Sequence, residues 1–258
     1  MKFIRALWGD LEHHDSKPRK EIIRCSKEQR FDEVVFVWGE SNYNFIKSFG
    51  YEAILMSKDP YEYGTHYFYE SHTFFLHKLV AIKTGVELYE QIIFLDWDIY
   101  QQKPLDLNFY RKLEEQNSKL QIPLYCFPNN YEEYVLKEWK DISREDVKYL
   151  HKHQAVLQKY NWQWANNVVV PNTSFVYCSD LSIAEEFIRI NQEEDIEIVS
   201  DETPVMHYFL NQGTTLEAYI KKYEPLVSNA KFETHFKQKD LNDYIKLFIS
   251  KDLYFIHE

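Results

Sequence analysis

Gln91-Ile92-Ile93-Phe94-Leu95-Asp96-Trp97-Asp98 joins a run of four apolar residues to two carboxylates that are separated by one residue. The apolar run has the continuous hydrophobicity of a strand that is buried on both faces of a sheet. In an open α/β sheet, the end of such a strand lies beside the ligand crevice. If the strand geometry continues, Asp96 and Asp98 point to the same side. The stretch therefore predicts a ligand site at the end of a buried strand.

The two carboxylates of this site are candidate metal ligands. Carboxylates this close repel each other, and burying them without partners is costly. A divalent cation removes the conflict, and oxygen ligands suit Mg²⁺ or Mn²⁺, which keep coordination positions for substrate phosphates. The alternative is a strand end at which Asp96 and Asp98 cap the next helix or face solvent.

The first half of the chain alternates between strand and helix patterns. Strands are expected at residues 3–8, 33–38, 52–56 and 92–95, and helices at residues 20–30, 42–49 and 71–84, the last ending at Gly85. Such alternation is typical of βαβ units and a mostly parallel sheet. The expected fold class is α/β.

The second half is less regular. Strands are expected at residues 123–127, 168–178 with a break at Pro171, and 253–256, and helices at residues 146–159, 182–191 and 202–210. No shift in composition marks a boundary. The expectation is one domain, residues 1–258, with a nucleotide-binding half at residues 1–125 and an acceptor-side half at residues 126–258.

Composition excludes several classes of protein. The net charge of −11 gives no basic footprint for a duplex, which argues against a nucleic-acid partner. The 6 glycines form no glycine-rich phosphate loop. The 3 cysteines form no C-x-x-C pair, as expected of reduced thiols in a cytoplasmic protein. No stretch has the pattern of a signal peptide or the length of a membrane span, which predicts a soluble protein.

Three later segments complete a pattern. Asn172-Thr173-Ser174-Phe175-Val176-Tyr177 reads as a turn and a strand, Asp201-Glu202 opens a helix, and Phe255-Ile256-His257-Glu258 follows near the C-terminus. With the D-x-D triplet, this order resembles the GT-A fold glycosyltransferases, especially the glycogenin and bacterial galactosyltransferase-like branch. Ser174 stands where that family has glycine, and Trp97 where small residues are common.

The resemblance implies a Rossmann-like, mostly parallel sheet flanked by helices, with a more irregular acceptor-binding half. It implies a hexosyltransferase-like enzyme that moves a sugar from a nucleotide-diphosphate sugar to a glycan or other hydroxyl acceptor. A UDP-sugar is favoured and a GDP-sugar is the alternative. The ligands of Mn²⁺ or Mg²⁺ would be Asp98, Asp96, which can also contact the ribose, and His257. Such a cation stabilises the charge on a departing nucleoside diphosphate.

Further residues are candidates for donor binding. Trp8, at the end of the first strand, can stack on the base, and Asp10 can hydrogen-bond the base or ribose. Lys78 is a candidate for the diphosphate, with an exposed helix lysine as the alternative. Asn172 and Thr173 would contact hydroxyl groups of the donor sugar or acceptor.

Asp201 and Glu202 are the candidate catalytic carboxylates. They would act as a base in an inverting reaction, or orient the acceptor and stabilise oxocarbenium character in a retaining one. The alternative is that they only cap a helix. Trp162 and Trp164 are the acceptor candidates, because indole faces suit sugar rings.

Two other functions fit the same sheet and metal chemistry. A nucleotidyltransferase would normally carry a glycine- and basic-rich loop after the first strand, and residues 9–18 are poor in glycine. A non-catalytic relative would bind a nucleotide sugar without turnover. Haloacid-dehalogenase phosphatases are disfavoured because their D-x-D normally lies near the N-terminus.

Overall fold

The computed structural model describes residues 1–9, 17–28, 32–57, 76–115, 119–127, 163–164, 167–193, 201–213, 227–229 and 253–257. The main sheet has six strands, in the order β3 (Glu52–Leu55), β2 (Glu33–Val37), β1 (Lys2–Leu7), β4 (Ile92–Leu95), β10 (Phe175–Cys178) and β6 (Leu120–Gln121). β1, β2, β3 and β4 are parallel, and β10 runs antiparallel to both of its neighbours. The expected α/β class with a mostly parallel sheet is confirmed.

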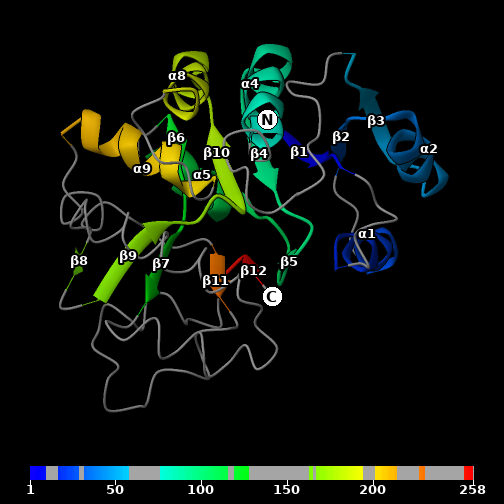
Figure 1. Ribbon diagram of the computed structural model, residues 1–258. Coiled ribbons are helices and arrows are strands. Elements are labelled where there is room, and N and C mark those ends of the chain that lie inside the picture. The colour runs from blue at the N-terminus through cyan, green and yellow to red at the C-terminus, as the bar shows by residue number, and fades with distance from the viewer. Residues whose placement is uncertain are drawn as a thin grey trace, which may run out of the picture.

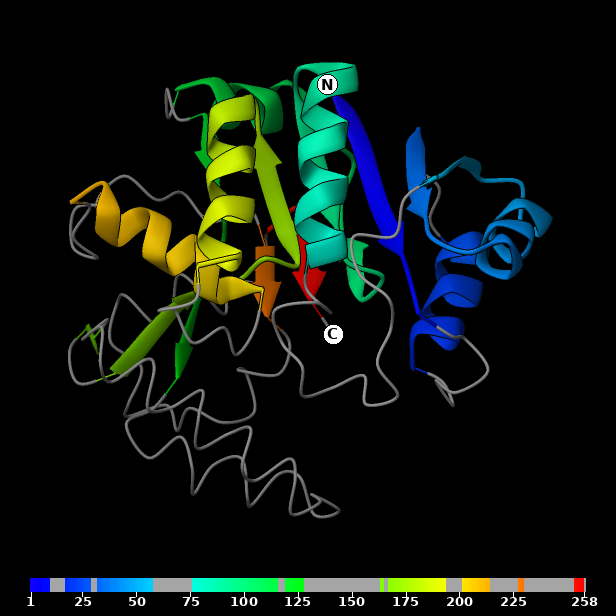
Figure 2. The ribbon, with the colours of Figure 1, turned by 45° about the horizontal axis from the view of Figure 1, so that its top comes forward.

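One face of the sheet packs against α4 (Leu76–Tyr89) and α8 (Leu181–Asn191), which lie side by side in both ribbon views (Figures 1 and 2). α9 (Glu202–Asn211) packs against α8. Residues of these helices and of β1, β2, β4 and β10 form one apolar cluster. The continuous apolar runs of the strands are explained by this burial, because both faces of the sheet are covered.

The other face is covered by two smaller apolar clusters. Residues of α1 (Lys17–Glu28) and α2 (Glu40–Ser48) pack against β1 and β2, and residues of α5 (Leu107–Glu115) pack against β4 and β10. Along β1, Ile4 and Ala6 belong to the cluster under α4, whereas Phe3 and Leu7 belong to the clusters on the opposite face. Arg5, between Phe3 and Leu7 in this alternation, is fully buried.

Two three-stranded sheets complete the described part of the fold. β5 (Ile99–Gln101) pairs antiparallel with β12 (Phe255–His257), which pairs parallel with β11 (Val227–Asn229). β9 (Asn167–Pro171) lies between β7 (Leu124–Phe127) and β8 (Gln163–Trp164). β5 begins only a few residues after β4 ends, so the first of these sheets brings the C-terminal strand beside the turn that follows β4 (Figure 1).

The predicted end of the helix at Gly85 is wrong. α4 continues to Tyr89, and Glu90 rather than a glycine takes the positive φ, 63°, after it. A Cβ at Gly85 would lie 2.7 Å from Ile4 Cδ1 and 3.3 Å from Ile92 Cγ2. The glycine therefore allows α4 to pack closely on β1 and β4. The predicted helix at residues 146–159 lies outside the described residues.

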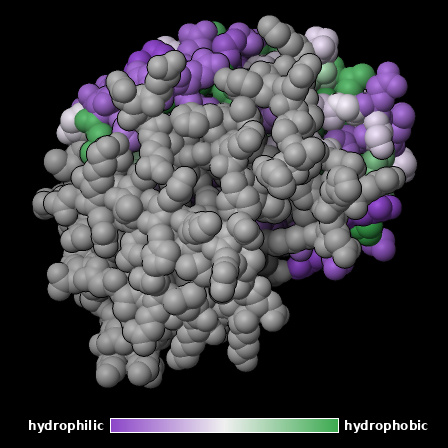
Figure 3. Space-filling view, viewed as in Figure 1, coloured by the Kyte–Doolittle hydropathy of each residue, from purple (hydrophilic) through white to green (hydrophobic). Residues whose placement is uncertain are grey.

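The surface of the described part is mostly hydrophilic. Figure 3 shows separate hydrophobic spots among hydrophilic residues on the face of Figure 1. Two large exposed hydrophobic side chains, Leu88 and Leu107, lie on different helices. No helix among the described segments has both the length and the apolar character needed to cross a bilayer. Cys25 and Cys178 are buried free thiols.

Candidate functional site

The D-x-D triplet forms a turn and not a continuation of the strand. β4 ends at Leu95, and the Asp96 carbonyl accepts a hydrogen bond from the Ile99 amide at 3.2 Å. The Asp96 amide donates to the Ser174 carbonyl at 2.8 Å, which ties the turn to the segment before β10. The strand geometry therefore does not continue through Asp98, and the condition for Asp96 and Asp98 to share a side of the strand is not met. Asp98 occupies the third position of a four-residue turn, and its side chain and that of Asp96 are partly exposed.

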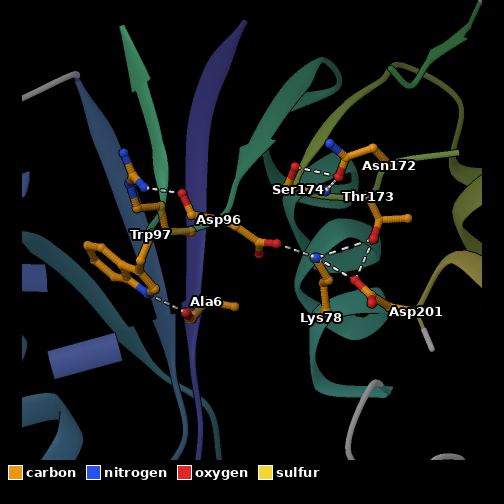
Figure 4. A network of polar contacts seen from close by, with 9 residues as sticks. Ala6, Lys78, Asp96, Trp97, Asn172, Thr173, Ser174 and Asp201 are labelled. Carbon is orange, nitrogen blue, oxygen red and sulfur yellow. Dashed lines mark hydrogen bonds and ion pairs between the residues drawn. The ribbon is translucent and has the colours of Figure 1, made fainter. Parts of the chain in front are cut away.

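Trp97, in the middle of the triplet, connects the turn to strand β1. Its side chain is buried, and its indole Nε1 donates to the Ala6 carbonyl at 2.9 Å (Figure 4). Its ring makes an edge contact with Tyr51, with 5.8 Å between the ring centroids. A small residue at this position would leave that space empty, which explains why a tryptophan fits here.

Lys78 connects the turn to two other segments. Figure 4 shows its ammonium between Asp96 on one side and Thr173 and Asp201 on the other. Nζ lies 2.8 Å from Asp96 Oδ2 and 3.3 Å from Thr173 Oγ1, and it also donates to Asp201 Oδ2. Only 4% of the Lys78 side chain is exposed, so the alternative of a solvent-exposed helix lysine is wrong.

The charges in this cluster shift one another's pKa values. Burial disfavours the charged form of Lys78, but the carboxylates of Asp201 and Asp96 outweigh it and raise the pKa of Lys78. Burial would also raise the pKa of Asp201, yet Lys78 and Thr173 outweigh it and the pKa is lowered. For Asp96, burial is the largest influence, and the carboxylates of Asp98 and Asp201 add to it. The pKa of Asp96 is raised to about 6 although Lys78 opposes the shift.

The segment between β9 and β10 presents Thr173 to this cluster. Asn172 Oδ1 accepts from the Ser174 amide at 3.0 Å and also from the Ser174 hydroxyl, which closes a tight local turn. All three side chains are buried. Ser174 keeps a negative φ, so the structure does not need glycine at this position.

Asp201 stands at the start of α9 but does not cap it. Its side chain makes no capping hydrogen bond, and its Oδ2 instead accepts from Lys78 and from the Thr173 hydroxyl. The capping alternative is therefore wrong for Asp201. Glu202 follows in the first turn of α9 with a partly buried side chain.

Trp8 lies at the end of β1, on the same edge of the sheet. Because parallel strands end at one edge, Trp8 and the turn after β4 share the edge where this type of sheet binds ligands. Trp8 is stacked on His77, with 5.7 Å between the ring centroids and an interplanar angle of 4°. Asn42 Nδ2 donates to the Gly9 carbonyl at 2.7 Å and fixes the backbone that follows Trp8.

Four of the predicted site residues either have only their backbone described by the structure or lie outside the described residues. In the pairing of β12 with β5, His257 lies opposite Ile99, the residue directly after Asp98. Trp164 pairs with Asn167 in the short β8, and the structure describes only the backbone of Trp164 and His257. Asp10 and Trp162 lie outside the described residues.

The described donors fit a hard cation in part. Asp96 and Asp98 supply carboxylate oxygens from one turn, and a single ammonium, that of Lys78, serves both Asp96 and Asp201. Mg²⁺ and Mn²⁺ are commonly held by one or two carboxylates together with substrate phosphates. Among the described side chains, no group of three or more His, Cys, Asp or Glu could hold a metal ion.

The sequence interpretation missed Arg5 and Glu33. Arg5 Nη1 donates to the Asp96 carbonyl at 2.6 Å, and Arg5 Nε pairs with Glu33 Oε2 at 2.6 Å. The available signal was an arginine inside an otherwise apolar strand. Such a residue is rarely buried unless it is paired.

No family model and no curated protein matches this sequence. Among solved structures, the chain is similar to a glycosyltransferase involved in the glycosylation of the major capsid of PBCV-1. The identity is 12%, with 99% of this chain and 92% of that chain covered and a TM-score of 0.44. It is also similar to mouse xyloside xylosyltransferase 1 in its apo form, at 10% identity, with 100% and 97% covered and a TM-score of 0.46.

Proposed function

We propose that this protein is a metal-dependent glycosyltransferase that takes a sugar from a nucleotide-diphosphate sugar. A UDP-sugar is favoured over a GDP-sugar, and a glycan or another hydroxyl compound is the acceptor. The observation that carries the proposal is the Asp96-Trp97-Asp98 turn at the end of β4, joined through Lys78 to Thr173 and Asp201. The turn, α4, the segment between β9 and β10 and the start of α9 thereby contribute polar side chains at the edge where sheets of this type bind ligands.

The donor would lie along this edge, between β1 and β4. Trp8 offers a partly exposed indole at the end of β1 for the base, and Asp10 is the candidate for a hydrogen bond to the base or ribose. Asp96 and Asp98 would hold Mn²⁺ or Mg²⁺, and β12 brings the backbone of His257 to the same turn. When bound, the cation supplies Lewis-acid stabilisation of the diphosphate leaving group.

The two catalytic candidates differ in what they can do. Asp201 has a lowered pKa, and one of its oxygens is already bound by Lys78 and Thr173. A group held in this way is suited to orient a sugar hydroxyl or to stabilise positive charge, because taking up a proton would break its ion pair. We therefore assign Asp201 to orientation. Glu202, which follows it, is the candidate base for the acceptor hydroxyl.

Lys78 and Asn172 would keep this arrangement in place. The ammonium of Lys78 holds the carboxylates of Asp96 and Asp201 near each other, while Asn172 closes the turn that presents Thr173. We propose that Trp162 and Trp164 bind the acceptor, on the chemistry of the indole ring alone.

The test is release of nucleoside diphosphate from a panel of nucleotide sugars, with and without Mn²⁺. We expect Mn²⁺-dependent release from one donor and its loss in Asp98→Asn. Asp32→Asn is the matched control, because Asp32 is 91% exposed and pairs with Lys2 at the opposite edge of the sheet. Donor binding without release would identify a non-catalytic relative. Release of pyrophosphate from a nucleoside triphosphate and a sugar phosphate would identify a nucleotidyltransferase.

A further inference from the structure

The main chain of the D-x-D turn is fixed by buried side chains that lie beneath it. The Asp96 carbonyl accepts from Arg5 Nη1 at 2.6 Å, and the Trp97 carbonyl accepts from Cys25 Sγ at 3.2 Å. The guanidinium of Arg5 also lies over the Trp97 ring, 4.9 Å from its centroid. Both carbonyl groups that precede Asp98 are therefore bound before any ligand arrives.

Arg5 is held in turn by Glu33 on the neighbouring strand β2. The two side chains are 0% and 1% exposed, and Nε lies 2.6 Å from Glu33 Oε2. Arg5 Nη2 and Glu33 Oε1 are buried, and neither has a hydrogen-bond partner among the described residues. A buried ion pair with unused polar atoms is a poor source of stability, because desolvation offsets the attraction. Its geometry points to another role.

We propose that Arg5, paired with Glu33, is a positioning residue that sets the direction of the two carboxylates toward one divalent cation. The planar guanidinium can donate to Glu33 and to the Asp96 carbonyl at once while it stacks on Trp97. The contacts with the Asp96 carbonyl and with the Trp97 ring hold the Asp96–Trp97 segment, and the contact with Glu33 holds Arg5 itself. The inference rests on the proposed function, since it requires the turn to bind Mn²⁺ or Mg²⁺.

The decisive variant is Arg5→Met/Glu33→Met, tested by Mn²⁺ titration with the electron paramagnetic resonance signal of free Mn²⁺ as the readout. Replacing both partners leaves no unpaired buried charge, so the double variant is expected to fold. We expect its Mn²⁺ affinity to fall by about 10- to 100-fold, as is usual when a group that orients a metal ligand is removed. A folded double variant with the wild-type affinity overturns the proposal.

A second variant decides the question if the double variant does not fold. Arg5→Lys keeps the positive charge beside Glu33 but lacks the planar fork that reaches two acceptors. Its Mn²⁺ affinity is expected to lie between those of the wild type and the double variant. A folded Arg5→Lys protein with unchanged affinity overturns the proposal.

Ile4→Val is the matched control for a general weakening of β1. Ile4 is equally buried and adjacent in sequence, but it faces α4 on the other side of the sheet. It is expected to leave the Mn²⁺ affinity unchanged. An affinity loss in Ile4→Val equal to that in the double variant overturns the role of Arg5, whereas absence of Mn²⁺ binding by the wild type overturns the metal site of the proposed function itself.

Discussion

Two positively charged side chains, Lys78 and Arg5, bind different groups of Asp96, and they differ in how far solvent reaches them. Lys78 binds the Asp96 carboxylate and Arg5 binds the Asp96 carbonyl. On the Lys78 side, the Asp96 side chain is 32% exposed and that of Asp201 is 13% exposed. On the Arg5 side, the ion pair with Glu33 is closed to solvent. One cation therefore holds side chains that a ligand can reach, and the other holds the main chain.

This difference in exposure indicates that the contacts of Lys78 can rearrange when a ligand binds, whereas those of Arg5 cannot. The lysine ammonium is a compact charge on a flexible stem, and it can redistribute between carboxylates when a ligand arrives. The arginine fork is planar and fully buried, so we expect its contacts to stay the same when a ligand binds. We expect substitutions on the two sides to separate the effects on stability, chemistry and metal binding.

The largest effect is expected for Lys78→Met. It leaves the partly exposed Asp96 and the nearly buried Asp201 without the counter-ion that they share, which should cost up to about 3 kcal/mol of the free energy of unfolding. Urea unfolding measures this loss. Lys83→Met, on the same helix but paired at the surface with Glu87, should stay within about 0.5 kcal/mol of the wild type. Equal stabilities for the two variants would show that Lys78 does not hold this side together.

A smaller effect is expected for Asp201→Asn. If Asp201 orients a hydroxyl, the rate of sugar transfer should fall by no more than about 100-fold, and the acidic limb of the pH–rate profile should stay in place. Removal of a general base typically costs about 10²- to 10⁴-fold and abolishes that limb. Because the pKa of Asp201 is lowered, the steady-state rates have to extend down to about pH 3 to distinguish the two cases. A lost limb would return Asp201 to the role of base.

Thr173→Val should cost about 2 kcal/mol in stability. The substitution keeps the shape of the side chain but removes a buried hydroxyl that donates to the Asp201 carboxylate, and hydrogen bonds to charged groups contribute about that much. Thr173→Ser keeps the hydroxyl and should recover most of the loss. Stability is measured by thermal or urea unfolding. Equal free energies of unfolding for Thr173→Val and Thr173→Ser would contradict the prediction.

The smallest effect lies away from both sides, at the N-cap of α8. Hydrogen bonds from Lys119 and Ser182 lower the pKa of Asp180 to about 2. The carboxylate therefore stabilises the folded state above pH 4, and this contribution is lost as the pH falls toward 2. Asp180→Ala should cost about 1 kcal/mol at pH 7. The difference in the free energy of unfolding between this variant and the wild type should narrow below pH 4. A difference that stays constant with pH in urea titrations would contradict the stabilising role of the Asp180 carboxylate.

The sequence predicted the strands and helices around the site better than the contacts within it. The apolar run of β4, the break at Pro171 and the start of α9 at Glu202 follow from local patterns, because burial and turn residues leave a periodic signal. The turn at Asp96 does not, since the two-residue period of a strand contains no information about an i to i+3 hydrogen bond.

The burial of charged residues could not be predicted from local sequence patterns either. Lys78 is buried because the first turn of α4 contacts both the D-x-D turn and the start of α9, and this depends on packing between distant segments. Gly85 was misread for the same reason, because close packing on Ile4 and a helix end both favour glycine. Arg5 alone carried a signal, as a charge inside an apolar strand.

The pairing of β5 with β12 affects the order in which parts of the fold can form during translation. Gln102, just after β5, bonds to the backbone of Phe255 across 153 positions of the chain. At roughly 5–20 residues per second, translation takes on the order of 10–30 s to cross that interval. During this time the nascent chain carries the Asp96–Asp98 turn without the strand that lies beside it. The metal affinity that we propose for this turn should therefore rise only after residues 253–257 have paired with β5.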